Sequence, residues 1–178
     1  MDTKLTGKTR IESDLIGARE IPAEALYGVQ TLRGIENFSI SKFRLSEYPL
    51  FIKGLAITKM AAAMANFELG LLTVEQKDAI IAACGEILDG KHHDQFPVDM
   101  IQGGAGTTTN MNANEVIANR ALELMGHERG EYQYCSPNDH VNCSQSTNDA
   151  YPTAIHIGMY FKHLQLLPHL EELIASFR

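Results

Sequence analysis

Residues 149–178 carry a single helical pattern that runs to the last residue of the chain. Apolar residues recur in it at the spacing of one face of an α-helix. They are Ile157, Phe161, Leu164, Leu167, Leu170, Ile174 and Phe177. An apolar face of this length needs partner helices, and no later segment supplies them. We therefore expect a truncated chain in preference to one completed by other chains. Pro168 removes an amide donor inside the pattern and is expected to kink the helix.

Three further helices are expected upstream of that segment. Residues 50–70 are rich in Ala, Met, Leu and Ile and end at a glycine, which is typical of a buried helix. Thr73 and Gln76 have the spacing of a capping box, and apolar residues at helical spacing continue from there to Gly90. A third helix is expected over residues 109–125. The pattern therefore predicts a mainly α fold.

The remaining segments are expected to be irregular. Residues 10–45 contain two short alternating stretches, at 10–12 and 38–40, that indicate short strands between glycines and a proline. Residues 126–148 are polar and loop-like. No apolar run is expected to approach the roughly 20 residues that cross a bilayer. The N-terminus lacks the basic-then-apolar order of a secretory signal.

The composition argues against some classes of function. The formal net charge of −7 disfavours a broad nucleic-acid-binding face, while 44% hydrophobic and 21% charged residues are ordinary for a soluble globular protein. Cys84, Cys135 and Cys143 have no metal-binding spacing, and we expect idle thiols that suit a reducing cytoplasm. We therefore expect a cytoplasmic protein with no nucleic acid and no membrane among its partners.

Two segments have an excess of small polar residues. The first, residues 103–115, reads GGAGTTTNMNANE and places threonines and asparagines after a glycine turn that opens a helix. Free amides at a helix start, with hydroxyls beside them, suit an anionic oxygen such as a carboxylate. An ordinary capped helix start explains the same residues, so both interpretations stay open at this point.

The second polar segment, residues 136–149, places Ser146, Thr147 and Asn148 at the mouth of the long helix. Hydroxyl and amide side chains can bind a carboxylate and an amino group without adding charge. An N-cap provided by Asn148 or Asp149 is the alternative. Eleven polar residues in this segment exceed what a cap needs, and the sequence does not decide between the two interpretations.

Other motifs fit less well. The glycine cluster lacks the Gly-Lys-Ser/Thr ending of a P-loop and does not follow a clear strand, as a dinucleotide fingerprint would. His92, His93 and Asp94 are expected in a solvated loop rather than a metal site. His140 beside Asp139 is either an acid–base pair or, as we favour, a hydrogen-bonded structural histidine.

Both polar segments resemble signature regions of the fumarase/aspartase superfamily. Residues 103–121, GGAGTTTNMNANEVIANRA, resemble its first conserved block, and residues 144–154, SQSTNDAYPTA, resemble the second. Residues 27–33, YGVQTLR, are similar to its N-terminal region. The likeness extends from about Arg10 to the end of the chain, and three matches together make it specific.

The amino-acid sequences of these segments resemble those of the aspartase branch. Residues 103–107 read GGAGT, where fumarases usually read TGSGTQ, and Thr147 stands where fumarases usually carry a second serine. Residues 131–142, EYQYCSPNDHVN, also resemble aspartases. Fumarases typically have a histidine of their second anion site where this chain has Ser136.

The resemblance implies an enzyme that converts L-aspartate to fumarate and ammonia through an aci-carboxylate intermediate, whose growing charge needs fixed donors. It implies that Thr107, Ser146 and Thr147 hold the carboxylate beside the abstracted proton, and that Thr147 and Asn148 lie near the departing amino group. The base of the family is a serine in a later Gly-Ser-Ser loop, which is expected beyond Arg178 and is not contained in this sequence. No catalytic residue, and no activity, is therefore expected within these residues alone.

The resemblance also implies the architecture. Residues 1–145 would form an N-terminal lyase domain, and residues 146–178 would begin a central helical bundle. Members form homotetramers whose active sites combine three subunits, act on a small-molecule substrate and require no cofactor, although divalent metal ions activate some of them. The alternatives are a class II fumarase and a non-catalytic structural relative on the same scaffold.

Overall fold

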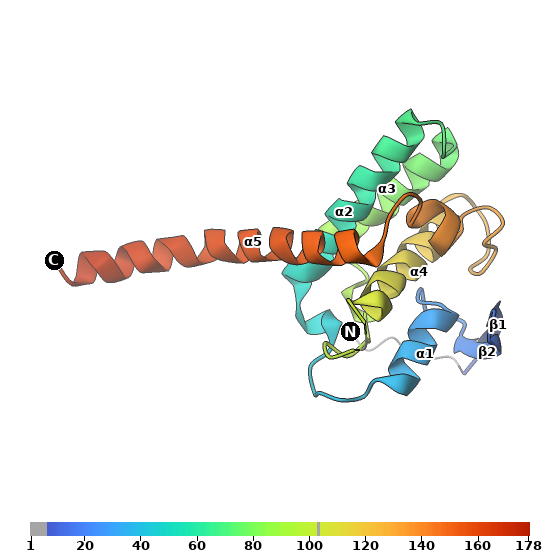
Figure 1. Ribbon diagram of the computed structural model, residues 1–178, viewed down its shortest axis with the longest axis horizontal. Coiled ribbons are helices and arrows are strands. Elements are labelled where there is room, and N and C mark those ends of the chain that lie inside the picture. Colours follow the sequence, from blue (N-terminus) through green and yellow to red (C-terminus); the bar gives the residue numbers. More distant parts are fainter. Residues whose placement is uncertain (1–6, 103) are drawn as a thin grey trace.

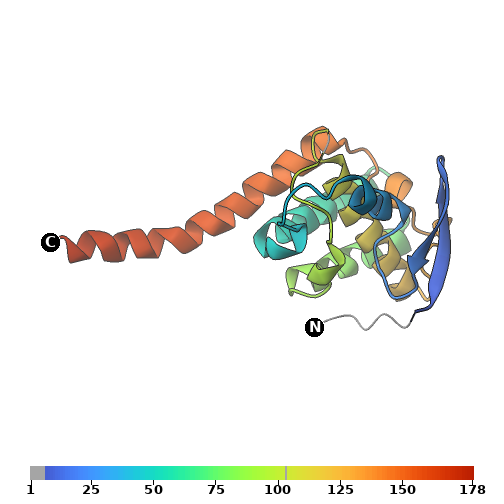
Figure 2. The ribbon, with the colours of Figure 1, turned by 90° about the horizontal axis from the view of Figure 1, so that it is seen from below.

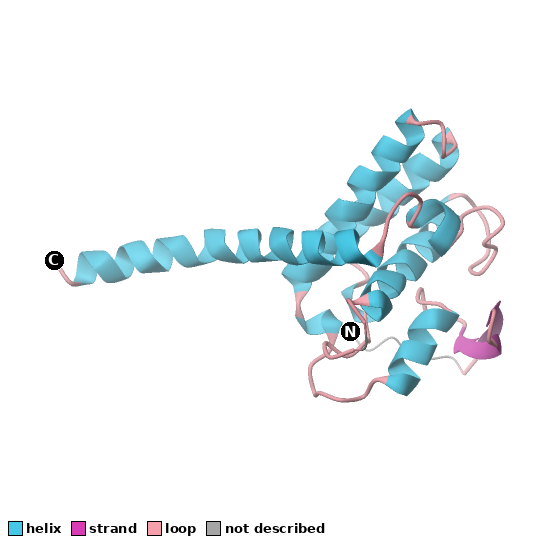
Figure 3. Ribbon diagram, viewed as in Figure 1, coloured by secondary structure: helices cyan, strands magenta, loops and turns pink. Residues whose placement is uncertain are grey.

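The computed structural model describes residues 7–102 and 104–178. It has a helical body with a small sheet at one side and one long helix that leaves it (Figures 1 and 3). The mainly α expectation is confirmed. The elements are the strands β1 (Thr9–Asp14) and β2 (Gly17–Pro22), the helices α1 (Val29–Asn37), α2 (Pro49–Glu68), α3 (Val74–Leu88), α4 (Thr107–Leu124) and α5 (Thr147–Ser176), the 3₁₀ turns Leu45–Glu47 and His93–Gln95, and the π-helical turn Pro137–Val141.

β1 and β2 form an antiparallel hairpin in which Asp14 pairs with Gly17 at the turn. The expected strand at residues 10–12 is therefore confirmed. The expectation of a strand at residues 38–40 is wrong, because those residues have no regular structure. The amide of Ile40 donates instead to the buried carboxylate of Asp99, at 3.0 Å, so a side chain takes the place of a ladder partner.

α2 is the central helix of the core, and it packs against both α3 and α5. It is 20 residues long with a mean hydropathy of 1.3, so by length and composition alone it could cross a membrane. That corrects the expectation that no run approaches this length. Its apolar side chains lie instead in a core shared with α3 and α4, which includes Ile52, Leu55, Ile80, Ile87, Val116, Ile117 and Leu122.

The start of α3 has the predicted capping box. The Thr73 hydroxyl accepts a hydrogen bond from the amide of Gln76 at 3.2 Å, and the amide of Thr73 donates to Gln76 Oε1 at 3.1 Å. Each side chain accepts a hydrogen bond from a backbone amide that has no acceptor within the helix. The prediction is therefore confirmed, as are the positions of α2, α4 and α5 to within two residues.

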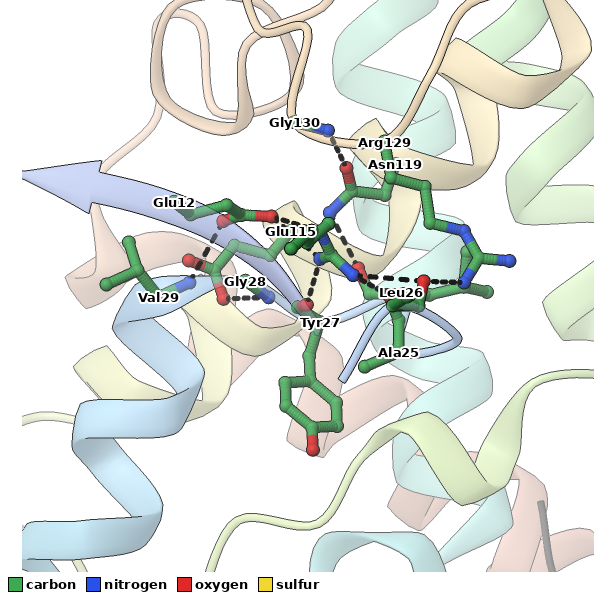
Figure 4. A network of polar contacts seen from close by, with 12 residues as sticks. Glu12, Ala25, Leu26, Tyr27, Gly28, Val29, Glu115, Asn119, Arg129 and Gly130 are labelled. Atoms are coloured by element: carbon green, nitrogen blue, oxygen red, sulfur yellow. Dashed lines mark hydrogen bonds and ion pairs between the residues drawn. The ribbon is translucent and has the colours of Figure 1, made fainter. Parts of the chain in front are cut away.

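α1 lies where an irregular segment was expected, and its start is fixed by two buried carboxylates (Figure 4). Glu12 Oε2 accepts from the amide of Val29 at 3.1 Å. Glu115, on α4, accepts from the amides of Gly28, Gln30 and Thr31 at 2.8–3.0 Å. A Cβ at Gly28 would lie 2.6 Å from Glu12 Oε2, so the two carboxylates can approach only a glycine.

α5 is continuous through Pro152 and Pro168, and Figure 2 shows its outer half bending away from the direction of its inner half. The inner half packs against α2 and buries Ala150, Ala154 and Gly158. From residue 162 onward every residue is exposed, so the predicted apolar stripe of the outer half has no partner in the described part of the chain.

Candidate functional site

The starts of α4 and α5 lie together, as Figures 1 and 2 both show. Asn110, in the first turn of α4, donates from Nδ2 to the hydroxyl of Thr147 at 3.2 Å. The ring of Tyr151, in the first turn of α5, lies against Gly106. The fold therefore brings the two polar segments into one place, although they are far apart in the sequence.

No threonine or asparagine of this segment is the N-cap of α4, so the expectation of a helix start capped by those residues is wrong. Its N-cap residue is Gly106, with φ +84°, and a Cβ there would collide with the Tyr151 ring. Gln102, before the glycine turn, accepts from the amide of Thr109 at 2.9 Å. Within the described residues, the first two amides of the helix, including that of the exposed Thr107, donate to no other group.

The start of α5 is a capping box whose N-cap is Ser146, so the helix is capped, but not by Asn148 or Asp149 as the alternative had it. The Ser146 hydroxyl accepts from the amide of Asn148 at 3.1 Å, and the amide of Ser146 donates to Asp149 Oδ1 at 3.1 Å. The cap does not use up the polar groups, because the Ser146 hydroxyl still has its proton to donate. Ser146 and Asn148 are exposed and Thr147 is half-buried.

A buried lysine contacts the residues just before the start of α5. Lys59, on α2, is 0% exposed, and its Nζ donates to Asn142 Oδ1 and to Gln145 Oε1, each at 2.9 Å. Asn142 Oδ1 also accepts from Asn110 Nδ2 at 3.0 Å. Burial lowers the pKa of Lys59 to about 7. The sequence reasoning missed this residue, and the available signal was a lysine within the most apolar helical stretch.

His140 and Asp139 do not form a pair. His140 Nδ1 accepts from the amide of Ser136 at 2.7 Å, and its Nε2 lies 3.2 Å from Gln76 Nε2. Asp139 accepts instead from the Ser136 hydroxyl at 3.0 Å. Burial lowers the pKa of His140, which favours the neutral ring. The structural-histidine interpretation is the one that the geometry supports.

The other candidates from the sequence are engaged locally. His92 Nε2 lies 2.8 Å from Glu86 Oε2, and His93 Nε2 lies 2.9 Å from the carbonyl oxygen of Ile87. Among the described residues, no group of three or more His, Cys, Asp or Glu side chains could hold a metal ion. Cys84 and Cys135 are buried, and burial raises the pKa of each thiol to about 12, which suits idle thiols.

The catalytic base is expected beyond Arg178, so none of the residues described here was predicted to be that base. Arg178 itself is exposed and follows the free end of α5, far along the helix from the starts of α4 and α5 (Figures 1 and 2). Arg178 is therefore no part of the candidate site. The position of the base stays a prediction.

The arrangement can bind a small anion. The two helices begin close together, so the positive ends of both helix dipoles lie in the same region, with the amides of α4 that have no partner among the described residues. Hydroxyl groups of Thr107, Ser146 and Thr147 stand at these helix starts, and Asn148 adds an amide. Such neutral donors suit a carboxylate whose charge increases during a reaction.

Comparison with known proteins shows the family to which the chain belongs. A family model described as lyase matches residues 17–178. The aspartate ammonia-lyase of Helicobacter pylori is 59% identical over 168 residues, which are 94% of this chain and 36% of the relative. The aspartate ammonia-lyase of Escherichia coli is 56% identical over 174 residues, which are 97% of this chain and 36% of the relative.

Solved structures give the same result. A fumarate lyase:delta crystallin from Brucella melitensis, bound to cobalt, superposes with a TM-score of 0.94 at 52% identity, covering 96% of this chain and 37% of that one. A class II fumarase from Schistosoma mansoni gives 0.79 at 39% identity, covering 85% and 32%. The chain thus spans about a third of the length of these proteins.

Proposed function

The chain belongs to the lyase family and has the fold of the fumarase/aspartase superfamily, and on that premise we propose that it forms part of an aspartate ammonia-lyase. Such an enzyme removes a proton from the carbon beside one carboxylate of L-aspartate. The electron pair of that bond forms the double bond of fumarate, the carbon–nitrogen bond breaks, and ammonia leaves. The identities of 56–59% to aspartate ammonia-lyases support this assignment.

The proposed substrate-binding residues are Thr107, Ser146, Thr147 and Asn148. Proton removal beside a carboxylate leaves that group with a second negative charge, which fixed hydrogen-bond donors stabilise. The hydroxyls of Thr107, Ser146 and Thr147 would donate to it, together with the free amides at the start of α4. Thr147 and Asn148 would lie near the departing amino group. The observation that carries the proposal is the contact between the starts of α4 and α5.

The rest of the site lies outside this sequence in the proposal. The base would be a serine of a Gly-Ser-Ser loop beyond Arg178, which these 178 residues do not contain. The complete enzyme would be a cytoplasmic homotetramer with sites shared by three subunits. It would require no organic cofactor, with divalent metal ions acting as activators at most. Residues 1–145 would be its N-terminal domain, and residues 146–178 would begin its helical bundle.

A pair of chimeras tests the proposal. In the first, called the aspartase chimera, this chain replaces the segment that it matches in the Escherichia coli aspartate ammonia-lyase. In the second, called the fumarase chimera, it replaces the matching segment of the Schistosoma mansoni fumarase. Fumarate absorbance follows the deamination of aspartate in one and the hydration of fumarate in the other. The unmodified chain serves as a further control and is expected to form no fumarate.

The aspartase chimera is expected to deaminate aspartate at a rate comparable with the parent enzyme, and the fumarase chimera is expected to lose hydration. The reverse pattern would overturn the proposal in favour of a fumarase, the runner-up. Two folded but inactive chimeras, with native circular dichroism and sedimentation, would favour the non-catalytic relative. A second junction, after Gly158, keeps the comparison valid if the first disturbs folding.

A further inference from the structure

Lys59 fixes the direction of the hydrogen bonds behind Thr147. The lysine Nζ has hydrogens to donate in either charge state, and it lies 2.9 Å from Asn142 Oδ1. Asn142 uses its own amide nitrogen elsewhere, donating to the carbonyl of Gln145 at 3.0 Å. The oxygen and nitrogen of the Asn142 side chain are therefore not interchangeable, and its oxygen faces both Lys59 and Asn110.

The orientation of Asn110 follows from that of Asn142. Its Nδ2 donates to Asn142 Oδ1 at 3.0 Å, and the same nitrogen lies 3.2 Å from Thr147 Oγ1. The Thr147 hydroxyl must therefore accept this bond. A hydroxyl has a single proton, and accepting this bond does not use that of Thr147. Within the described part of the chain, it donates to no protein group.

We propose that Asn110 is a positioning residue that presets the Thr147 hydroxyl as a donor to the substrate carboxylate. This inference rests on the proposed function of Thr147. Asn110 is 1% exposed, so it acts through Thr147 and does not itself touch the substrate. A donor that is already oriented needs no rearrangement while the charge of the carboxylate grows, which is the condition for strong stabilisation of the transition state.

The other end of the Asn110 amide is unpaired among the described residues, as are those of Asn112 and Asn114 on the same helix. Its Oδ1 is buried, and no donor among the described residues reaches it. Leaving a buried carbonyl oxygen unpaired costs stability, whereas a leucine of similar shape would remove that cost. A position that served only packing would therefore favour leucine. The two hydrogen bonds that the side-chain nitrogen of Asn110 donates explain why an asparagine stands at this position.

The test uses four variants of the aspartase chimera: Asn110→Leu, Thr147→Val, the double variant, and Asn114→Leu as the matched control. Asn114 is equally buried on the same helix, and its one hydrogen bond to a described residue is to Met111 Sδ, at 3.5 Å. Asn110→Leu is expected to lower kcat about tenfold, with a smaller change in KM and an unchanged or higher melting temperature. Thr147→Val is expected to lower kcat by 10²–10³-fold.

The double variant decides between the two explanations. If Asn110 acts through Thr147, the double variant has the kcat of Thr147→Val alone. A loss equal to the product of the single losses, a normal kcat in Asn110→Leu, or an equal loss in Asn114→Leu would each overturn the proposal for Asn110. A normal kcat in Thr147→Val would instead overturn the proposed function of Thr147, so the two failures are distinguishable.

Discussion

The carboxylate of Glu115 accepts the backbone amide of Gly28 at 2.8 Å, across 87 residues of sequence. The same carboxylate accepts the amides of Gln30 and Thr31, so a side chain of α4 holds the start of α1. Glu115 lies in the middle of α4 and thus links α1 to the helix on whose start the candidate site is built. The integrity of α1 is therefore expected to depend on Glu115, which accepts three of its amides, together with Glu12, which accepts one.

Glu115→Gln replaces one of the two accepting oxygens by a donor and leaves buried amides without a partner. We expect a loss of about 3 kcal/mol in stability, since each unsatisfied buried group costs roughly 1–3 kcal/mol. Hydrogen exchange is expected to accelerate at the amides of Gly28, Gln30 and Thr31. Glu128→Gln, at an exposed glutamate, is the control. Unchanged exchange in α1 would contradict the role of Glu115.

Gly28→Ala is expected to destabilise the fold by a different route. The added Cβ would lie 2.6 Å from Glu12 Oε2 and 2.8 Å from the Glu115 carboxylate, so one of the two caps must move. Gly85→Ala, within α3, is the matched control, because nothing lies within 4 Å of the added Cβ there. Helix propensity predicts that this control gains about 1 kcal/mol. Melting temperatures that change in the same direction would refute the argument.

The helices that follow from the sequence are those whose signals are local. Thr73 and Gln76 are three residues apart, and the apolar spacing of α2 and α5 lies within each helix. α1 was missed because its caps, Glu12 and Glu115, are distant in sequence, while Gly28 and Gly34 gave the segment the look of a loop. Tertiary contacts, not local pattern, determine that element.

The candidate site was predictable in the same limited way. Thr107, Ser146 and Thr147 came from polar segments at helix starts and from the resemblance, and nothing in the sequence set Asn110 apart from its neighbours Asn112 and Asn114. Only the contact with Thr147 distinguishes it. Lys59 was missed because periodicity cannot tell a buried lysine from an exposed one. Its partners Asn142 and Gln145 are identified only by the fold.

Lys59 is expected to give stability an unusual pH dependence. Burial lowers its pKa from 10.5 to about 7, so between these values the unfolded chain binds more protons than the folded one. Stability contributed by Lys59 therefore rises as pH increases from 7 toward 10, by at most about 1.4 kcal/mol per pH unit. Urea unfolding at pH 7 and pH 9 is expected to show this rise in the wild type and to lose it in Lys59→Met. Lys53→Met, on the same helix, is the control and should keep the rise. Loss of the rise in Lys53→Met as well would contradict the assignment to Lys59.

The outer half of α5 is expected to drive self-association of the chain. Leu167, Leu170, Ile174 and Phe177 are 39–83% exposed on a helix that projects from the body (Figure 2). Apolar faces of this kind bury themselves against other helices. Sedimentation at increasing concentration is expected to detect oligomers, whereas a variant with Leu167, Leu170 and Ile174 changed to Gln should stay monomeric. A monodisperse wild-type monomer would refute this expectation.

Thr147→Val distinguishes a substrate-binding hydroxyl from a structural one. Valine keeps the shape of threonine and deletes only the hydroxyl. The cap of α5 depends on Ser146, whose hydroxyl accepts the amide of Asn148, so the stability of α5 should fall by less than the roughly 1 kcal/mol that a lost cap costs. Asn110 Nδ2 retains its hydrogen bond to Asn142, while its second N–H loses the acceptor that Thr147 provided, which adds a cost of roughly 1 kcal/mol.

Turnover is expected to respond differently from stability. Loss of one donor to a carboxylate that gains charge in the transition state typically lowers kcat by 10²–10³-fold, or about 3–4 kcal/mol. The measurement compares kcat for aspartate and the free energy of unfolding in the aspartase chimera with Thr147→Val. Thr153→Val, an exposed threonine of the same helix, is the matched control. Thr109→Val is unsuitable as a control, because Thr109 is buried and pairs with Gln102 across the glycine turn. If Thr147→Val and Thr153→Val had the same kcat, the hydroxyl of Thr147 would have no part in binding the substrate.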